Sequence, residues 1–285
     1  MRIVRRPKQL ARLIRQMKSR GERIGFVPTM GALHEGHLSL IRRAVKETDR
    51  VVVSIFVNPI QFDRKTDLRS YPRPLKEDAR LAAEAGADLL FVPSARAIYP
   101  PDFQTFVEVK KLSRPWEGRF RPGHFLGVTT VVAKLFHLVQ PEVAYFGRKD
   151  AQQHRIVGQM IRDLNFDIRL KVMPTVREPE GLAMSSRNRL LSSDARRSSR
   201  ALFHTLHEGR RLIQSGERRG SVVVRRMEGW IRRAAPGAKV DYAAAVDPQT
   251  LEPVSRIRKR VWLLLAVRIG GVRLIDEMEV RADRG

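Results

Sequence analysis

Short β-branched apolar segments alternate with longer amphipathic segments through the first 174 residues, and this alternation constrains the fold more than any other feature of the chain. The strand-like segments are residues 23–27, 51–57, 88–92, 142–146 and 168–173. Between them, helical periodicity covers residues 36–47, 74–85, 123–139 and 150–164. Strands that alternate with helices form mostly parallel sheets, with right-handed crossovers and helices on both faces. The pattern therefore predicts an α/β fold built on a parallel sheet that is flanked by helices.

The pattern changes after Leu191, where two helical segments precede three strand-like segments. The helical segments are residues 193–215 and 220–234, and the strand-like segments are residues 240–246, 261–267 and 272–278. This order is typical of an α+β domain. We therefore expect a first domain of residues 1–178 and a smaller α+β C-terminal domain of residues 179–285, with the boundary within residues 176–192.

Composition excludes several classes of protein. The chain has 285 residues and no cysteine, which rules out disulfides and thiolate metal sites and favours a cytoplasmic location. Its basic first 20 residues are amphipathic and lack the apolar core of a signal peptide. No uncharged apolar stretch reaches the roughly 18 residues that a membrane helix needs, so we expect no membrane partner.

The formal net charge of +25 admits two interpretations. One is an RNA-binding protein, and the other is an enzyme whose basic surface attracts polyanionic substrates. The arginines form scattered pairs at roughly helical spacing, for example Arg196-Arg197 and Arg210-Arg211. Aromatic residues seldom lie between them, whereas a surface that stacks single-stranded bases requires interleaved aromatics. We therefore favour a solvated basic surface and do not expect nucleic acid as a partner.

The first predicted strand leads into a segment with two histidines, VPTMGALHEGH (residues 27–37). If a helix begins near His34, both His34 and His37 lie on one side of its first turn, beside unpaired backbone N–H groups and the positive end of the helix dipole. Gly31 and Gly36 allow a nucleotide to approach the backbone closely. Zinc is the weaker alternative, because the HxxH spacing lacks a third ligand. The segment therefore predicts a phosphate-binding site.

The second predicted strand ends in the segment SIFVNPIQFD (residues 54–63), which contains Asn58 and Gln61. Their side-chain amides both donate and accept hydrogen bonds, which suits the recognition of a hydroxy acid. An Asn-Pro pair on its own is only a turn signal, and this alternative stays open.

The fourth predicted strand ends in the segment YFGRKDAQQ (residues 145–153). Here Gly147 permits close approach to the backbone, and Lys149 is a mobile cation for phosphate charge. Asp150 either caps a helix or accepts hydrogen bonds from a ribose, and Gln153 lies one turn further on.

The fifth predicted strand is followed by a long polar segment, PTVREPEGLAMSSRNRLLS (residues 174–192). It contains Met184, Ser185, Ser186 and Arg187 in succession. Two hydroxyls and a guanidinium group make a clamp for a triphosphate, and a helix cap beside an exposed arginine is the alternative.

Together these segments resemble the pantoate–β-alanine ligase family. The segment PTMGALHEGH is similar to the HIGH signature of nucleotidylyltransferases and class I aminoacyl-tRNA synthetases, and MSSRN is similar to their KMSKS loop. The other matching segments are VSIFVNPIQF, YPRPLKED, RPGHFLGV, YFGRKDAQQ and VREPEGLAMSSRNRLLS. The resemblance covers residues 24–192 with few breaks and extends more weakly to the C-terminus. It implies a Rossmann-like N-terminal domain of the HIGH-type nucleotidylyltransferase fold, with the active site in the cleft between two domains.

The resemblance implies an enzyme that condenses (R)-pantoate with β-alanine to pantothenate. The reaction consumes ATP, passes through a pantoyl adenylate, and releases pyrophosphate and AMP. The implied cofactors are ATP and Mg²⁺, with Mg²⁺ bound through the ATP phosphates and not by a metal site on the chain. Pantoate, β-alanine and ATP are the implied small-molecule partners. The family also implies a homodimer. Because the adenylate must be shielded from water, we expect the C-terminal domain to close over the active site.

The resemblance also assigns the site residues. His37 is implied as the proton donor, and His34, Lys149 and Arg187 as further catalytic residues. The implied ATP-binding residues are Met30, Gly31, Ala32, Leu33, His34, Glu35, Gly36, His37, Gly147, Arg148, Lys149, Asp150, Val176, Met184, Ser185, Ser186 and Arg187. Gln61 and Gln153 are implied to bind pantoate, with Gln61 also near β-alanine and Asn58 beside them.

Two departures from the family pattern bear on charge near the nucleotide. Arg148 stands where the family usually has Glu or Gln, and Leu126 stands where Arg is common.

Two alternative functions fit parts of the sequence less well. A nucleotidylyltransferase that stops at an adenylate or dinucleotide would not need the amides of Asn58, Gln61 and Gln153. An RNA-binding protein on a synthetase-like core would not need all four active-site segments.

Overall fold

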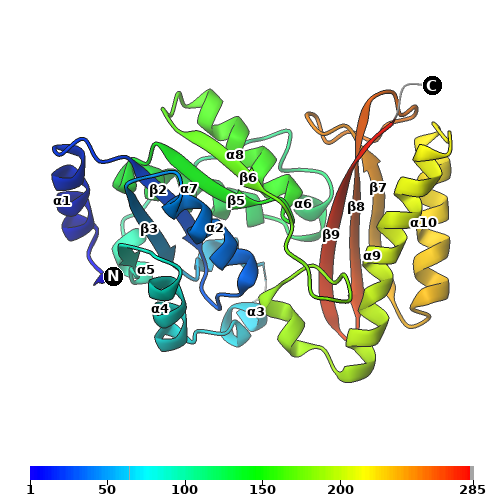
Figure 1. Cartoon of the computed structure of the whole chain (residues 1–285), viewed down its shortest axis with the longest axis horizontal. Helices are drawn as coiled ribbons and strands as arrows, with labels where there is room; N and C mark the ends of the chain where they lie inside the picture. Colours follow the sequence, from blue (N-terminus) through cyan, green and yellow to red (C-terminus); the bar gives the residue numbers. More distant parts are fainter. Residues whose placement is uncertain (64, 283–285) are drawn as a thin grey trace. The chain divides into compact units, whose positions relative to one another are not determined.

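A parallel sheet of six strands, in the order β1-β4-β3-β2-β5-β6, forms the centre of the first of two structural units (Figure 1). The strands are β1 (Arg2–Val4), β2 (Ile24–Thr29), β3 (Arg50–Ile55), β4 (Leu89–Phe91), β5 (Val143–Gly147) and β6 (Arg169–Met173). The computed structural model describes residues 1–63 and 65–282. The first unit comprises Met1–Arg148 and Gln152–Pro174, and the second comprises Lys149–Ala151 and Thr175–Gly285. The predicted α/β fold is confirmed, although β1 is too short to stand out in the sequence.

Helices cover both faces of this sheet because neighbouring residues of each strand point to opposite sides. Val27 of β2 lies in a buried cluster with Leu38 of α2, whereas the ring of Phe26 meets Phe136 of α7 edge-on at 6.3 Å. The longer helices of the unit are α1 (Pro7–Lys18), α2 (Glu35–Val45), α4 (Leu75–Glu84), α7 (His124–Val139) and α8 (Ala151–Asp163). Shorter helical segments are η1 (Pro59–Gln61), α3 (Lys65–Ser70), α5 (Ala95–Ile98) and α6 (Glu117–Phe120).

The strand order places the four polar segments of the sequence at neighbouring strands. Strands β3, β2, β5 and β6 are consecutive in the sheet and all parallel. Their carboxyl ends therefore lie along one edge, where ligands bind in open α/β sheets. Each of the four segments begins where one of these strands ends.

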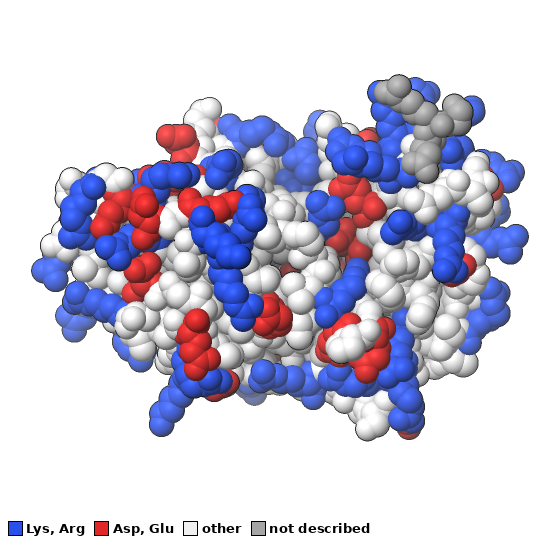
Figure 2. Space-filling model, viewed as in Figure 1, with Lys and Arg blue, Asp and Glu red and all other residues white. Residues whose placement is uncertain are grey.

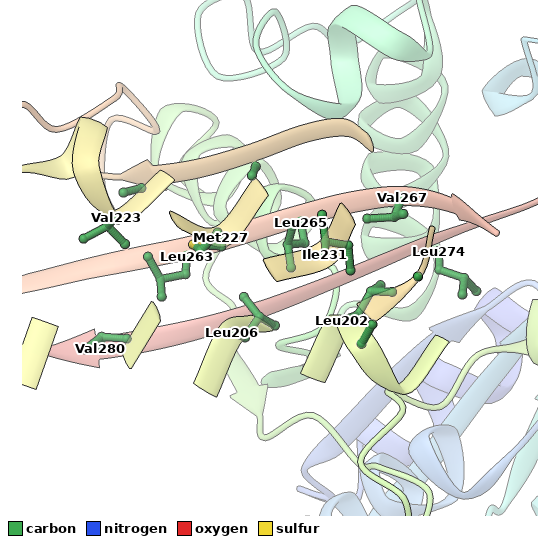
Figure 3. Close-up of a cluster of buried hydrophobic side chains, with 14 of the residues drawn as sticks. Leu202, Leu206, Val223, Met227, Ile231, Leu263, Leu265, Val267, Leu274 and Val280 are labelled. Carbon is green, nitrogen blue, oxygen red and sulfur yellow. The ribbon is translucent and has the colours of Figure 1, made fainter. Parts of the chain in front are cut away.

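The second unit is an antiparallel sheet of three strands with two helices packed on it. Its strands are β7 (Lys239–Val246), β8 (Arg260–Ile269) and β9 (Val272–Arg281), and its helical segments are η2 (Ser186–Leu190), α9 (Ser193–Gln214) and α10 (Gly220–Ala234). Alternate residues of β8, such as Leu263 and Leu265, point into one cluster with Leu206 of α9 and Met227 of α10 (Figure 3). The predicted α+β character of this part is thereby confirmed.

Lysine and arginine side chains are spread over the visible face of both units and lie among acidic side chains (Figure 2). Several arginines of α9 and α10 pair with a carboxylate one turn away, as Arg211 does with Glu208 and Arg232 with Glu228. Such pairs are typical of solvated helix surfaces. Among the residues that the structure describes, none of the helices has the length and apolar character needed to cross a bilayer.

Candidate active site

The two histidines of the first polar segment form the start of α2. His34 is the residue that caps the helix, with an extended backbone at φ −144° and ψ 174°. Its Nδ1 accepts a hydrogen bond from the Gly36 backbone N–H at 3.2 Å, and Nδ1 of His37 accepts one from the His34 backbone N–H at 3.3 Å. The two imidazole rings lie 4.1 Å apart between centroids. The structure therefore brings His34 and His37 together, as the sequence predicts.

These cap bonds fix the tautomer of both rings. A neutral imidazole has one nitrogen that accepts and one that donates. Because Nδ1 accepts in both His34 and His37, each neutral ring carries its proton on Nε2. The pair therefore offers two N–H donors from side chains, which suits an anionic ligand such as a phosphate.

The second polar segment holds Asn58 and Gln61 in a buried position, at 1% and 5% exposure. Asn58 Nδ2 donates to Gln61 Oε1 at 3.1 Å, and Asn58 Oδ1 accepts from the Tyr99 hydroxyl at 2.9 Å. Burial raises the pKa of Tyr99, so its hydroxyl stays a donor. Gln61 Nε2 in turn lies 2.7 Å from the sulfur of Met30, which joins this segment to the first. Both polar atoms of Asn58 are thus engaged in orienting its neighbours.

The RPGHFLG segment, to which no role is assigned from the sequence, supports Gln61 from the start of α7 and from the residues just before it. His124 Nδ1 lies 2.8 Å from the Gln61 carbonyl oxygen, and a guanidinium nitrogen of Arg121 lies 3.4 Å from the same atom. The Gly127 carbonyl accepts from Asn58 Nδ2 at 2.9 Å. Arg121 and His124 lie 60 and 63 residues from Gln61 along the chain, so local periodicity gives no sign of these contacts. The RPGHFLG motif is the signal in the sequence that points to them. Leu126 takes no part in these three contacts.

The third polar segment separates two adjacent glutamines by environment. Gln152 is 4% exposed, and its amide donates to the carbonyls of Leu112 and Pro115, both at 2.8 Å, while its oxygen accepts from the Glu117 N–H at 3.0 Å. Gln153 is only partly buried. Gln152 is therefore a structural residue, and Gln153 is the glutamine that is accessible to a ligand.

The same segment contains the predicted cation. Lys149 Nζ lies 3.6 Å from Asp150 Oδ1, and the two side chains are 18% and 46% exposed. Helix α8 begins at Ala151, so Asp150 immediately precedes it. The Arg148 backbone N–H donates to the Met173 carbonyl at 2.8 Å, which ties the end of β5 to the end of β6. At Gly147, a β-carbon would meet no atom of the chain within 4 Å.

The first part of the fourth polar segment, residues 176–184, forms a hairpin. The Met184 N–H donates to the Val176 carbonyl at 3.0 Å, which pairs these two predicted residues through their backbones. Arg177 holds the hairpin to β9 through two hydrogen bonds to Asp276, at 2.6 and 3.0 Å, and its guanidinium group stacks on Phe203 at 4.8 Å. The Asp276 side chain is 1% exposed. A buried bidentate pair of this kind gives the hairpin one orientation on its own sheet.

The predicted phosphate clamp follows this hairpin. Ser185 caps η2, since its hydroxyl accepts from the Arg187 N–H at 3.3 Å. Ser186 and Arg187 are partly exposed, and Arg187 forms no ion pair with any residue that the structure describes. The cap that the sequence offers as an alternative is therefore present at Ser185, together with a guanidinium group that is available to an anion.

Three further side chains, none of them a predicted site residue, hold the clamp in place. Asn188 is 3% exposed, and its Nδ2 donates to Glu178 Oε1 at 2.8 Å and to the Ala183 carbonyl at 3.1 Å. Arg196 of α9 pairs with the other oxygen of Glu178 and donates to the Asn188 carbonyl at 3.1 Å. Residues 185–187 are thus held at both ends by one network.

Comparison with known proteins identifies the family. The chain matches the family model described as Pantoate-beta-alanine ligase over residues 2–279. It is 49% identical to the pantothenate synthetase of Thermotoga neapolitana over 276 residues, which cover 97% of this chain and 98% of that protein. It is 51% identical to the pantothenate synthetase of Moorella thermoacetica over 261 residues, 92% of both chains.

Solved structures agree. The pantothenate synthetase of Thermus thermophilus superposes with a TM-score of 0.93 at 45% identity, covering 99% of this chain and 100% of that one. The pantoate–β-alanine ligase of Francisella tularensis, solved with β-γ ATP and β-alanine, has a TM-score of 0.81 at 35% identity and covers 100% and 99% of the two chains. The chain therefore belongs to the pantoate–β-alanine ligase family, and its activity is the ligation of pantoate to β-alanine in pantothenate synthesis.

Proposed function

We propose that the ligation proceeds through a pantoyl adenylate. A carboxylate oxygen of pantoate attacks the α-phosphorus of ATP, and the bond from that phosphorus to pyrophosphate breaks, with the electron pair leaving on pyrophosphate. The amine of β-alanine then attacks the acyl carbon, AMP leaves with the shared oxygen, and the amine loses a proton. Both steps need positioning and neutralisation of charge more than covalent help from the chain.

The paired imidazoles carry this proposal. The Nε2–H groups of His34 and His37, fixed by the cap bonds of Nδ1, would donate to the phosphate oxygens. His37 would be the proton donor to the leaving pyrophosphate in its cationic form, in which Nδ1 also carries a proton and gives up its cap bond. Lys149 and Arg187 would supply the positive charge. The other proposed ATP-binding residues are Met30, Gly31, Ala32, Leu33, Glu35, Gly36, Gly147, Arg148, Asp150, Val176, Met184, Ser185 and Ser186. The open space at Gly147 supports close approach of a ligand to the backbone there.

Gln61 and Gln153 would bind pantoate, and Gln61 would also lie near β-alanine. Asn58 supports this set through Gln61, because its own amide is engaged with Gln61, Tyr99 and Gly127. The complex of the Francisella tularensis ligase with β-γ ATP and β-alanine supports ATP and β-alanine as ligands.

Mg²⁺ would enter with the nucleotide. Within the residues that the structure describes, no group of three or more histidine or acidic side chains is placed to hold a metal ion. Mg²⁺ commonly binds through substrate phosphates with few protein ligands, and it would neutralise the charge of the triphosphate.

Family membership supports a homodimer, and the lack of cysteine supports a cytoplasmic location. The domain division at residue 178 stays a prediction.

Isotope transfer tests the adenylate. Purified protein would receive ATP, Mg²⁺, β-alanine and pantoate labelled with ¹⁸O in its carboxylate. We expect one ¹⁸O atom per AMP, because the attacking oxygen remains on phosphorus when the amide forms. Label in inorganic phosphate together with ADP would instead show an acyl phosphate, and unlabelled AMP would contradict both routes.

Single-substrate reactions and His37→Ala complete the test. Pyrophosphate release with pantoate alone, without free AMP, is expected for a bound adenylate. His37→Ala should slow this release by about two to four orders of magnitude, the usual contribution of a positioned proton donor. Unchanged release in that variant would remove His37 from the chemistry while leaving the ligase activity intact.

A further inference from the structure

The carboxylate of Asp78 holds the backbone of the segment that leads into the paired histidines. Its Oδ2 accepts from the Ala32 N–H at 2.9 Å, and its Oδ1 accepts from the Leu33 N–H at 2.7 Å. Asp78 lies in the first turn of α4 and is 1% exposed. Both oxygens therefore bind consecutive backbone groups in a place that water does not reach.

The backbone at this point needs such support. Gly31 and Ala32 have φ values of +81° and +51°, so two successive residues are in the left-handed region. A non-glycine residue there is strained and persists only where its surroundings fix it. A β-carbon at Gly31 would lie 2.9 Å from Asp78 Oδ2, so the carboxylate also requires a glycine beside it.

The remaining N–H groups of the turn are also satisfied within the chain. Gly31 N–H donates to the Thr29 hydroxyl at 3.1 Å, and Thr29 in turn donates to the Ser54 carbonyl at 2.7 Å. His34 N–H donates to His37 Nδ1. The backbone donors from residue 31 to residue 34 are thus committed to the chain.

We propose that Asp78 is a positioning residue for adenylate formation, which it serves by fixing the Ala32–Leu33 backbone so that His34 and His37 keep their cap geometry and their Nε2–H tautomers. It touches neither substrate nor nucleotide. The inference rests on the proposed role of the two histidines, and it assigns the YPRPLKED segment of the sequence a function.

Asp78→Asn is the test, with Glu142→Gln as its matched control. The carboxamide keeps one acceptor and presents an NH₂ group to the other backbone donor, which leaves that donor unsatisfied. Glu142 accepts from the Ile24 N–H at 2.6 Å, at the opposite end of the same strand β2. Both variants lose a carboxylate that accepts hydrogen bonds from the backbone. Asp78 binds the backbone just before the histidines, whereas Glu142 binds it at the far end of β2.

We expect Asp78→Asn to lower kcat by about 100-fold, the effect of small misplacement of a reacting group, with the KM for pantoate nearly unchanged. Glu142→Gln should lower Tm and leave kcat within about twofold of wild type, because the bonds of Glu142 to the Ile24 N–H and to Lys18 stabilise the fold far from the histidines. Equal kcat values in the two variants would overturn the proposal.

Nitrogen NMR of the imidazoles gives a readout that does not depend on activity. In the wild type we expect the signals of Nε2–H tautomers at His34 and His37, and in Asp78→Asn a mixture of tautomers. Unchanged tautomers beside a lower kcat would contradict the proposal. If the tautomers change in Asp78→Asn but His37→Ala releases pyrophosphate at the wild-type rate, the result counts against the proposed chemistry of the histidines and not against Asp78.

Hydrogen exchange of the wild type decides the case if Asp78→Asn does not fold. The Ala32 and Leu33 amides should be strongly protected, and equally so with and without a non-hydrolysable ATP analogue. Fast exchange in the free protein would contradict the hold of Asp78 on these amides. Protection gained only with the analogue would show that the amides bind the nucleotide instead.

Discussion

Gly127 of α7 lies directly against the backbone of Gln61, so closely that a β-carbon at Gly127 would come within 2.6 Å of the Gln61 nitrogen. The atoms in the way are backbone atoms, which cannot turn aside as a side chain can. We expect Gly127→Ala to displace Gln61, to raise the KM for pantoate at least tenfold and to cost about 1–3 kcal/mol of stability through overpacking. Steady-state kinetics and urea unfolding measure both effects. Gly158→Ala in α8 is the control, since its β-carbon would meet only the end of Leu170 at 3.3 Å.

A substitution at His34 can separate catalysis from folding. Asparagine is among the best N-cap residues, so His34→Asn keeps an acceptor for the Gly36 N–H and should leave Tm unchanged. It removes the Nε2–H donor, and we expect kcat/KM to fall by about 100-fold. His137→Asn, at an exposed histidine of α7, should leave the kinetics unaltered. A parallel fall in Tm and activity at His34 would mean that the ring acts only as a cap.

The adjacent glutamines of α8 should give opposite results. Gln153→Ala should raise the KM for pantoate by about tenfold, equivalent to ~1.4 kcal/mol, without loss of stability. Gln152→Ala removes three buried hydrogen bonds and should cost about 2–4 kcal/mol, with the KM retained in the protein that folds. Chemical denaturation and pantoate titration of the two variants check this division. A stability loss at Gln153 with no change in KM would remove it from the substrate site.

Glu178 should affect ATP more than pantoate. Glu178→Ala releases Asn188 and Arg196, which together hold residues 185–187, and we expect the KM for ATP to rise by about tenfold. Glu180→Ala is the matched control in the same hairpin, because Glu180 pairs only loosely with Arg200 at 3.4 Å and both are largely exposed. Equal ATP kinetics in the two variants would show that the network does not serve the nucleotide.

Glu47 should make the stability of the protein sensitive to acid. The hydrogen bond from Lys171, with help from Arg43 and Tyr145 and against the effect of burial, lowers the pKa of Glu47 from 4.5 to about 2. The unfolded chain takes up this proton at a higher pH than the folded chain does. The contribution of Glu47 is therefore complete above its unfolded value of 4.5 and is lost as the pH falls towards about 2.

Glu47→Gln measures this contribution. The free energy of unfolding of the variant should be about 1 kcal/mol below that of wild type at neutral pH, and the difference should shrink in acid. Glu252→Gln, at an exposed site, is the control. A difference that stays constant from neutral pH down to about pH 3, inside the window where the proton is taken up, would contradict the assignment.

The elements of the fold can be predicted where their signal is local. Apolar periodicity locates β2 to β9 and the long helices to within a few residues, because period and length are properties of neighbouring residues. The strand β1 escapes prediction because Arg2–Val4 is too short to show a period, and it is defined only by its pairing with β4.

The site can be predicted only in part, and the reason is again distance along the chain. The histidine pair is three residues apart and is visible in the sequence. The supports are not, because Asp78 reaches Leu33 across 45 residues and His124 reaches Gln61 across 63. The sequence suggests Asn58 as a ligand residue, whereas its amide is engaged with four neighbours, of which Tyr99 and Gly127 are far away along the chain.

The proposed role of the histidine pair links nucleotide binding to the integrity of the first turn of α2. Nδ1 of each ring accepts a hydrogen bond that caps the start of the helix, and Nε2 is the other polar atom of the ring. Thermodynamic coupling is reciprocal. If the intact turn increases the affinity for phosphate, bound phosphate stabilises the turn against fraying by the same free energy. Bound nucleotide should therefore protect the first turn of α2 against fraying, whereas the Ala32 and Leu33 amides that precede it are held by Asp78 with or without the nucleotide.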